Sequence, residues 1–279
     1  MPGNASVGAG RIVFDGTDLV AASAAERRAR RWRDISFVPQ SAMNSLDPVY
    51  RVGDQILEVL VHRGGQSRRA ARERAEELFR MVGLAPNRLD EYPHQFSGGM
   101  RQRVAIALAL ALEPRLVIAD EPVTALDVIV QRQVLDVLLG LQKRLGVSMI
   151  LVTHDISVVA YVCDRMVVMY AGRVVESGLT AEVLALPRHP YTMGLTNAFP
   201  DLERAGGELV PIDGAPPDLL DPPKGCRFAP RCPFAEERCR TVDPALDHDP
   251  AGHAVACHRA DEAAGLRERS KEVATWRTS

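Results

Sequence analysis

Apolar residues recur with a period of two in some segments of the chain and with a helical period in others. Residues Arg11–Gly16 alternate apolar and polar side chains before a turn, which predicts an edge strand and a hairpin. Residues Asp34–Pro39 predict a second strand, which ends beside Gln40.

Helical periodicity begins after Gln40 and continues to Gln95. Gly83 is expected to end the second of two helices, because glycine readily takes the left-handed position after a helix. The residues that share a predicted helix face are Val52, Ile56, Val59 and Leu60 in the first helix, and Ala71, Ala75, Leu78 and Val82 in the second.

The middle of the chain predicts a helix followed by a strand. Met100–Leu112 contains few helix breakers and is expected to end at Pro114. Leu116–Ala119 is uniformly apolar, which predicts a short strand buried on both faces. Asp120 and Glu121 follow this strand directly.

The next segments continue the alternation of helix and strand. Val128–Leu145 is strongly periodic and should end at Gly146, and Ser148–Thr153 predicts a buried strand before His154. Arg165–Glu176 predicts a hairpin that closes the sheet. This order predicts an α/β domain with a mainly parallel sheet.

The composition is that of a soluble globular protein, with 46% hydrophobic and 25% charged residues. The net charge of −2 argues against a nucleic-acid binder that acts through a broad basic field. The basic stretch Glu26–Arg33 is more readily a solvated helix face than a binding patch. Without a long uncharged apolar run or a signal peptide, we expect a cytosolic chain that reaches the membrane only through a partner.

Two segments carry chemistry that suits a phosphate. Ser97, Gly98 and Gly99 stand at the start of the predicted helix, where free N–H groups and the helix dipole favour an anion. Asp120 and Glu121 stand at the carboxyl end of a strand, where open parallel sheets bind their ligands. One carboxylate there can hold Mg²⁺, and its neighbour can orient a water for attack on a phosphate.

These segments together resemble the ATP-binding subunits of ABC transporters, over about Gly10–Cys257. SGGM resembles the family signature, LVIADE the Walker B strand, and ALD, which ends at Asp127, the loop that contacts the partner subunit. Gln40 in FVPQ is similar to the Q-loop glutamine, and His154 in ILVTHD to the switch histidine. In that family the helical insert docks on the coupling helix of the membrane subunit.

The resemblance implies the fold of a P-loop NTPase and a subunit that hydrolyses ATP with Mg²⁺. It implies that Asp120 coordinates Mg²⁺, that Glu121 polarises the attacking water and that His154 contacts the γ-phosphate. Gln40 would link the metal site to the helical insert. The residues expected to bind the nucleotide at the dimer interface are Ser97, Gly98, Gly99 and Asp127.

The P-loop itself is missing from the sequence, which contains no G-x-x-x-x-G-K-[ST]. This loop supplies the amide cradle and the lysine that hold the β- and γ-phosphates. The resemblance begins after the P-loop strand, the P-loop and the first helix of the family. We therefore expect either a truncated product or a subunit that dispenses with its own nucleotide site, and whether the chain is an enzyme stays open.

Past Leu186 the sequence becomes rich in proline and is expected to be irregular. The segment His189–Thr192, HPYT, resembles a motif narrow to oligopeptide and dipeptide importers. Cys163 is expected to be a core residue, and the charged Asp261–Ser279 a loose tail. The other four of the five cysteines are Cys226, Cys232, Cys239 and Cys257.

Such clustering in a cytosolic protein favours a metal over disulfides. The gaps of five, six and seventeen residues do not match the paired spacing of structural zinc sites. Importers with this tail resemble [4Fe–4S] proteins, so the resemblance implies an iron–sulfur cluster on the four cysteines. Zinc is the alternative, and unligated thiols are the third possibility.

The function that the resemblance implies is the ATP-hydrolysing subunit of an ABC importer for dipeptides, longer peptides or nickel chelates, at the inner face of the cell membrane. The expected partners are a second ABC ATPase subunit, membrane permease subunits and, indirectly, an extracytoplasmic peptide-binding protein, without nucleic acid. The alternatives are a non-catalytic subunit that donates its signature to a partner, or an inactive fragment; HPYT and the cysteines disfavour a soluble ABC ATPase of repair or translation. The expected division is an ATPase domain at 1–185 with a helical subdomain at about 42–105, an extension at 186–260 and a tail at 261–279.

Overall fold

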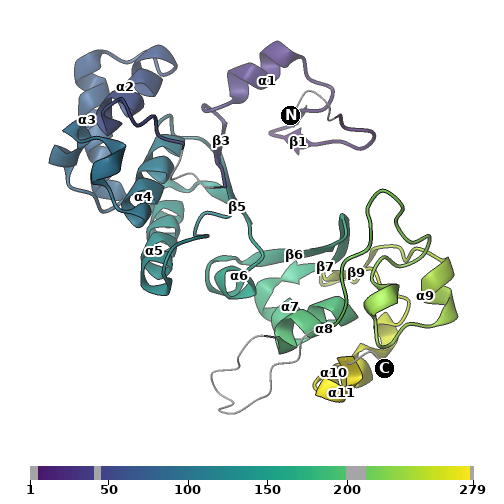
Figure 1. The fold of residues 1–279 in the computed structure, drawn as a ribbon. Helices are drawn as coiled ribbons and strands as arrows, with labels where there is room; N and C mark the ends of the chain where they lie inside the picture. Colours follow the sequence, from purple (N-terminus) through teal and green to yellow (C-terminus); the bar gives the residue numbers. More distant parts are fainter. Residues whose placement is uncertain (1–5, 41–44, 199–211, 277–279) are drawn as a thin grey trace. The chain divides into compact units, whose positions relative to one another are not determined.

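The computed structural model describes residues 6–40, 45–198 and 212–276, and the chain forms two compact units, Met1–His154 and Asp155–Ser279 (Figure 1). The sequence-based division at residue 185 therefore falls inside the second unit. Residues 42–44 of the expected helical subdomain and 277–279 of the expected tail lie outside the described residues. Among those described, none of the helices has the length and apolar character needed to cross a membrane.

The first unit begins with the predicted hairpin, in which β1 (Val13–Phe14) pairs antiparallel with β2 (Thr17–Asp18). The basic stretch forms α1 (Ala24–Arg30), which has no buried residues. Arg30 of α1 donates to the Thr17 hydroxyl at 2.7 Å, which ties the helix to the hairpin. The prediction of a solvated helix is confirmed for residues 26–30, whereas Arg31–Arg33 follow the helix as a turn.

Three parallel strands form the sheet of the first unit, in the order β3 (Ile35–Val38), β4 (Leu116–Asp120), β5 (Ser148–Val152). In the parallel pair formed by β3 and β4, Val38 lies opposite Ala119. The strands alternate with helices along the chain, so the predicted α/β class with a parallel sheet is confirmed.

One face of this sheet exposes apolar side chains. Val117 on β4 is 2% exposed, whereas Phe37 on β3 and Ile150 on β5 are 52% and 49% exposed. Phe37, Ile118 and Ile150 lie side by side in the register. The prediction that β4 and β5 are buried on both faces is therefore wrong, because among the described residues of this unit nothing covers that face.

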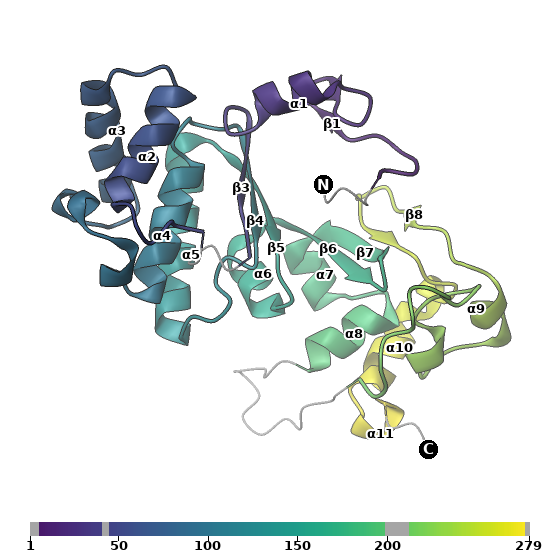
Figure 2. The ribbon, with the colours of Figure 1, turned by 45° about the horizontal axis from the view of Figure 1, so that its top comes forward.

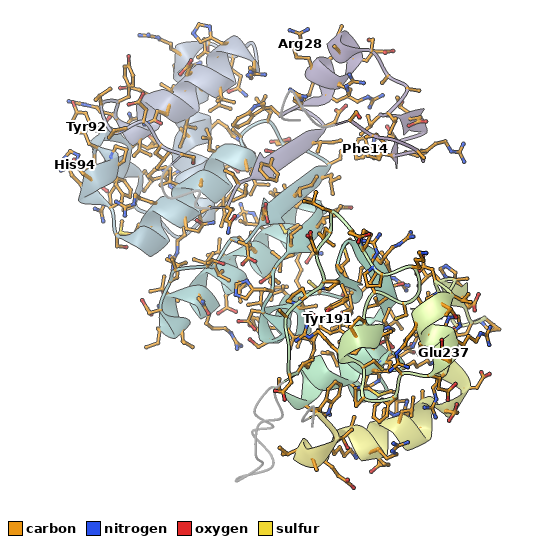
Figure 3. All side chains as sticks on the ribbon, turned by 45° about the vertical axis from the view of Figure 1, so that its right-hand side comes forward. Phe14, Arg28, Tyr92, His94, Tyr191 and Glu237 are labelled. Carbon is orange, nitrogen blue, oxygen red and sulfur yellow. The ribbon has the colours of Figure 1, made fainter. Side chains whose placement is uncertain are left out.

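The helical insert consists of α2 (Val52–His62) and α3 (Arg68–Met81), followed by the short 3₁₀ helices η2 (Pro86–Asp90) and η3 (Pro93–Gln95). Gly83 ends α3 with a φ of 72°, as predicted. The rings of Tyr92 and His94 stack at the surface of the insert, with centroids 5.7 Å apart (Figure 3). The predicted apolar faces are confirmed except at the half-buried Val59; the fully buried members are Val52, Ile56, Leu60, Ala71, Ala75, Leu78 and Val82.

Two longer helices pack side by side in this unit (Figure 2). The first, α4 (Gly98–Ala109), begins earlier than predicted and ends before Leu112, so Pro114 does not break it. The second, α5 (Val128–Leu145), has the predicted bounds and ends at Gly146, whose φ is 64°.

The second unit contains an antiparallel sheet in the order β6 (Arg165–Tyr170), β7 (Arg173–Leu179), β9 (Ala254–Val255), β8 (Asp247–His248). The predicted hairpin is confirmed as β6 and β7. Its expected role in closing the parallel sheet is wrong, since the second partner of β7 is β9, which the C-terminal extension supplies.

Regular structure continues past Leu186, where an irregular segment was expected. The motif HPYT begins α8, and two helices replace the expected loose tail, with Leu266 2% and Trp276 4% exposed. Buried apolar side chains hold these helices against the rest of the unit. The sequence did not predict the helices, because many charged residues surround these few apolar positions. The remaining elements are α6 (Ile156–Val162), α7 (Thr180–Ala185), α8 (Pro190–Asn197), η4 (Ala229–Arg231), α9 (Glu237–Thr241), η5 (Ala260–Glu262), α10 (Ala263–Ser270) and α11 (Val273–Trp276).

Candidate nucleotide and metal sites

The carboxyl ends of the three parallel strands bring four of the predicted site residues to one edge of the sheet. Gln40 follows β3, Asp120 ends β4 with Glu121 after it, and His154 follows β5. Because the strands are parallel and Asp120 lies opposite Val152 in the register, these ends share an edge.

Glu121 and His154 are in direct contact at this edge. The Nδ1 atom of His154 lies 2.7 Å from Oε1 of Glu121, and the backbone N–H of His154 donates to the same oxygen at 3.2 Å. The side chain of His154 is 76% exposed, whereas that of Glu121 is 14% exposed. A sheltered carboxylate therefore orients an imidazole that faces outward.

The backbone of Glu121 is held in an unusual conformation. Its φ is 50°, in the left-handed region, and its N–H donates to the Val152 carbonyl at 2.8 Å. The hydroxyl of Thr124 donates to Oε2, a contact that sequence reasoning missed. Burial raises the pKa of Glu121, but the hydrogen bonds from Thr124 and His154 outweigh it, so the pKa lies below its ordinary value.

Gln40 and Asp120 reach the same edge but do not join this pair. Gln40 is exposed and Asp120 is half-buried. The partners of Glu121 at this edge are Thr124 and His154. Both polar side chains thus stand at the edge of the sheet where a ligand would bind.

The signature segment forms the start of α4. Ser97 is the N-cap, and its hydroxyl accepts the N–H of Met100 at 3.4 Å. Gly99 is buried, and a Cβ on it would lie 2.2 Å from Cγ1 of Val130 on α5. The glycine is therefore required by the close approach of α5 as well as by any ligand.

A cavity of about 300 Å³ opens at this helix start, lined by Ser97 and Gly99 together with two arginines, Arg88 and Arg103. Arg88 donates to the Gln95 carbonyl at 3.0 Å and lies over the Phe96 ring at 4.8 Å. Arg88 also forms an ion pair with Glu91 at 2.8 Å, so Arg103 and the positive end of the α4 dipole are what give this cavity the character of an anion site. Sequence reasoning missed both arginines, although Arg103 lies one helical turn after Gly99.

Asp127, the last residue of ALD, caps the other helix at this corner. Its carboxylate accepts the N–H of Val130 at 2.9 Å, and Val130 is the residue that contacts Gly99. The two helix starts are thereby fixed to each other. Asp127 has a structural role here, whether or not it also faces a partner.

In the second unit, four cysteines line one small cavity of about 20 Å³, which they share with His189 and His258. These are Cys226, Cys232, Cys239 and Cys257. Burial raises the pKa of Cys232 to about 12 and that of Cys257 to about 11. Cys163 lies apart from them at the end of α6 and is half-buried.

The placement of these thiols sets limits on what they could hold. Among the described residues, no three His, Cys, Asp or Glu side chains are placed to hold a single metal ion. The four cysteines nevertheless line one cavity, and Cys226 and Cys239 add to the effect of burial in raising the pKa values of Cys232 and Cys257.

A buried carboxylate fixes the HPYT segment beside this cavity. Glu176 on β7 is fully buried and accepts the N–H groups of Arg188 at 2.6 Å and His189 at 3.1 Å, and Nε2 of His253 lies 2.8 Å away. Burial lowers the pKa of His189 to about 3, so its ring is neutral. Tyr191 (Figure 3) packs on Phe228 with centroids 5.3 Å apart. Sequence reasoning missed Glu176, because a lone Glu in a strand carries no signal.

The fold, the residues at the edge of the parallel sheet and the signature at the start of α4 define an ATP-binding cassette. Comparisons with known proteins agree with this class. Residues 1–124 match the family model described as "ABC transporter", and residues 175–239 match "Oligopeptide/dipeptide transporter, C-terminal region". The structure of a dimeric ATP-binding cassette in a post-hydrolysis state, bound to ADP and Pi, is 30% identical with a TM-score of 0.55, and the match covers 63% of this chain and 75% of that one.

Relatives narrow the class to peptide transporters. The dipeptide transport ATP-binding protein DppD of Bacillus subtilis is 46% identical over 94% of this chain and 79% of its own length. DppD of Haemophilus influenzae is 43% identical over 90% of this chain and 77% of its own length. The chain belongs to the family of ATP-binding subunits of peptide ABC transporters.

Proposed function

We propose that the chain works as the ATP-binding subunit of a peptide importer, with catalytic residues at the edge of its parallel sheet and a signature at the start of α4 that faces a partner's nucleotide. The observation that carries the proposal is the contact between Glu121 and His154 at the ends of β4 and β5. This pair sets a carboxylate and an imidazole where a phosphate and its attacking water would lie.

Each site residue has a role that its position supports. Asp120 would hold Mg²⁺ at the end of β4, Glu121 would polarise water, and His154 would reach the γ-phosphate with its exposed ring. Gln40 would connect this edge to α2 and α3. The residues assigned to the nucleotide of the partner subunit are Ser97, Gly98 and Gly99, and Asp127 would face that partner.

The cradle for the β- and γ-phosphates has no candidate in the sequence, so we propose that hydrolysis needs a P-loop from another segment or subunit. Two forms follow. In one, a P-loop joined to this chain completes its own site, and Glu121 is catalytic. In the other, the chain only donates its signature, and Glu121 is idle.

Reconstitution with an intact ABC ATPase subunit and its permease tests the proposal. The mixed assembly should hydrolyse ATP, and the chain alone should not. Glu121→Gln should leave the rate unchanged in the donating form and reduce it by about a hundredfold or more in the catalytic form. If the assembly fails to form, the proposed function is wrong.

The partners and location follow from the same proposal. We place the chain on the cytoplasmic face of a membrane, bound to permease subunits through the surface of the helical insert, with a peptide-binding protein acting on the far side. No nucleic acid is involved. A pull-down of permease subunits from detergent extracts tests this arrangement, with the exposed Tyr50→Asp as a surface variant.

For the second unit we propose a [4Fe–4S] cluster on Cys226, Cys232, Cys239 and Cys257, with zinc as the alternative. The shared cavity and the mutual proximity of the thiols support it. When bound, the cluster would supply structural cross-linking by four thiolates. Protein reconstituted anaerobically should hold about four iron atoms per chain and lose its colour in Cys232→Ser, with Cys163→Ser as the matched control. Stoichiometric zinc in a colourless protein would favour the alternative.

A further inference from the structure

A cavity in the second unit lies beside the cysteine cavity, and neither the nucleotide site nor the proposed cluster occupies it. It measures about 550 Å³ and lies between the β6–β7 hairpin, the loop at Arg227 and the loop at Asp243. Ligand cavities of small molecules span roughly 300–1,000 Å³, so this volume falls within their range. The apolar part of its wall includes Met169, Val174, Phe228 and Leu246.

Arg227 is a cation in this wall. Arg227 is half-buried, and its Nη1 donates to the Ala171 carbonyl. In the part of the chain that the structure describes, no carboxylate pairs with Arg227. A guanidinium has five N–H donors in a planar fork that matches a carboxylate, so most of its capacity remains for a ligand.

A carboxylate stands elsewhere in the same wall. Oδ2 of Asp243 lies 2.8 Å from Nη2 of Arg173, in an ion pair whose side chains are 41% and 56% exposed. Exposed ion pairs of this kind contribute about 0–1 kcal/mol, so a ligand ammonium can compete for Asp243. The cavity thus offers a cation, an exchangeable anion and an apolar surface.

We propose that this cavity binds a small zwitterion with apolar side chains, with its carboxylate on Arg227 and its ammonium on Asp243. Short apolar peptides and single apolar amino acids share this chemistry. The inference rests on the wall of the cavity alone and holds whether or not the chain takes part in ATP hydrolysis.

Because this cavity adjoins the cysteine cavity, a bound ligand can affect the reactivity of a thiol. Cys226 and Phe228 belong to the walls of both the larger cavity and the cysteine cavity. A ligand on Arg227 therefore contacts the loop that carries Cys226. Occupancy should slow the alkylation of Cys226 in metal-free protein.

Calorimetric titration of the full chain with Leu-Leu, its C-terminal amide, leucine and isocaproate tests the proposal. Leu-Leu should bind, and the amide should bind about tenfold more weakly or worse, because it lacks the carboxylate. Isocaproate, which lacks the ammonium group of leucine, should bind more weakly than leucine, and this would confirm the contact with Asp243. The ratio of the affinities for Leu-Leu and leucine shows whether the preferred ligand is a peptide or a single amino acid. No binding by any of the four, up to their solubility limits, would overturn the proposal.

Two variants locate the site on the protein. Arg227→Gln should weaken Leu-Leu binding about tenfold, and the exposed Arg238→Gln on α9 should leave it unchanged. Ala245→Trp fills the cavity from an exposed position, so it should block binding without disturbing the core. Binding that survives both Arg227→Gln and Ala245→Trp would place the ligand elsewhere and refute the assignment.

Discussion

Gly99 at the start of α4 lies so close to Val130 on α5 that a Cβ would fall 2.2 Å from Cγ1 of the valine. The signature glycine is thus also a packing residue between two helices of its own chain. A substitution of Gly99 would cause a clash with Val130 as well as a loss of contact with the nucleotide, and the two effects could not be separated. A test of the signature must therefore use a residue whose side chain already faces the cavity.

Ser97 offers that test, because Asp, Asn and Ser all cap helices well. Ser97→Asp should keep α4 folded and set a carboxylate in the phosphate cavity, and so lower the ATPase rate of the mixed assembly by about a hundredfold. Ser97→Asn has the same shape without the charge and should stay within a few-fold of wild type. Equal rates for the two variants would show that no phosphate approaches Ser97.

Gly99→Ala should destabilise the first unit by about 1–3 kcal/mol, because the β-branched Val130 cannot easily move aside. Urea unfolding measures this, and Val130→Ala should restore part of the loss. Gly140→Ala on α5 is the control, since a Cβ there meets nothing within 4 Å. A loss at Gly140 equal to that at Gly99 would contradict the clash.

The contact between Glu121 and His154 predicts a dependence of stability on pH. The folded-state pKa of Glu121 lies below the unfolded value near 4.5, so its stabilisation is present above that value. It is lost as the pH falls through the folded-state pKa. The stability advantage of wild type over Glu121→Gln in urea unfolding should shrink between pH 6 and pH 3; a constant difference would exclude the effect.

Glu176→Gln should destabilise the second unit by roughly 3–5 kcal/mol, because an amide group cannot serve three buried donors as a carboxylate does. Near-ultraviolet circular dichroism during thermal unfolding follows the aromatic core of this unit. Glu182→Gln on the exposed surface of α7 is the control and should have almost no effect. Equal melting temperatures for both variants would show that Glu176 does not stabilise the second unit.

Burial should make two cavity thiols unreactive in metal-free protein. With a pKa of about 12, Cys232 is almost wholly protonated at pH 8 and should react with iodoacetamide far more slowly than an unfolded cysteine. Cys257, with a pKa of about 11, should behave in the same way, and urea should release both. Mass spectrometry of labelled peptides measures these rates, and fast labelling in the native state would mean that the cavity is open.

The sequence predicted most of the first unit because its signals are local. The bounds of α5 follow from periodicity and from Gly146, and the parallel pairing of the strands follows from the alternation of strand and helix. It missed the exposed face at Phe37 and Ile150, because an apolar strand looks the same whether or not a layer covers it.

Long-range contacts explain the misses in the second unit. The pairing of β7 with β9 and the burial of Glu176 depend on residues far apart in the chain, which no window of sequence contains. The clustering of the four cysteines in the sequence favoured a shared metal site, but the type of site was expected only from resemblance, since their spacing matches no simple metal motif. Arg227 gave no signal at all, because a sequence does not show that none of the described carboxylates pairs with it.

The buried carboxylate on β7 also has a consequence for how the protein is made. Glu176 and His253 are separated by 77 positions, so the ribosome releases the β6–β7 hairpin well before the imidazole that completes its contacts. At about 5–20 residues per second, several seconds pass in which this acid must stay hydrated. The nascent second unit is therefore expected to remain open until β9 emerges, and chaperones have their longest access to it during that interval.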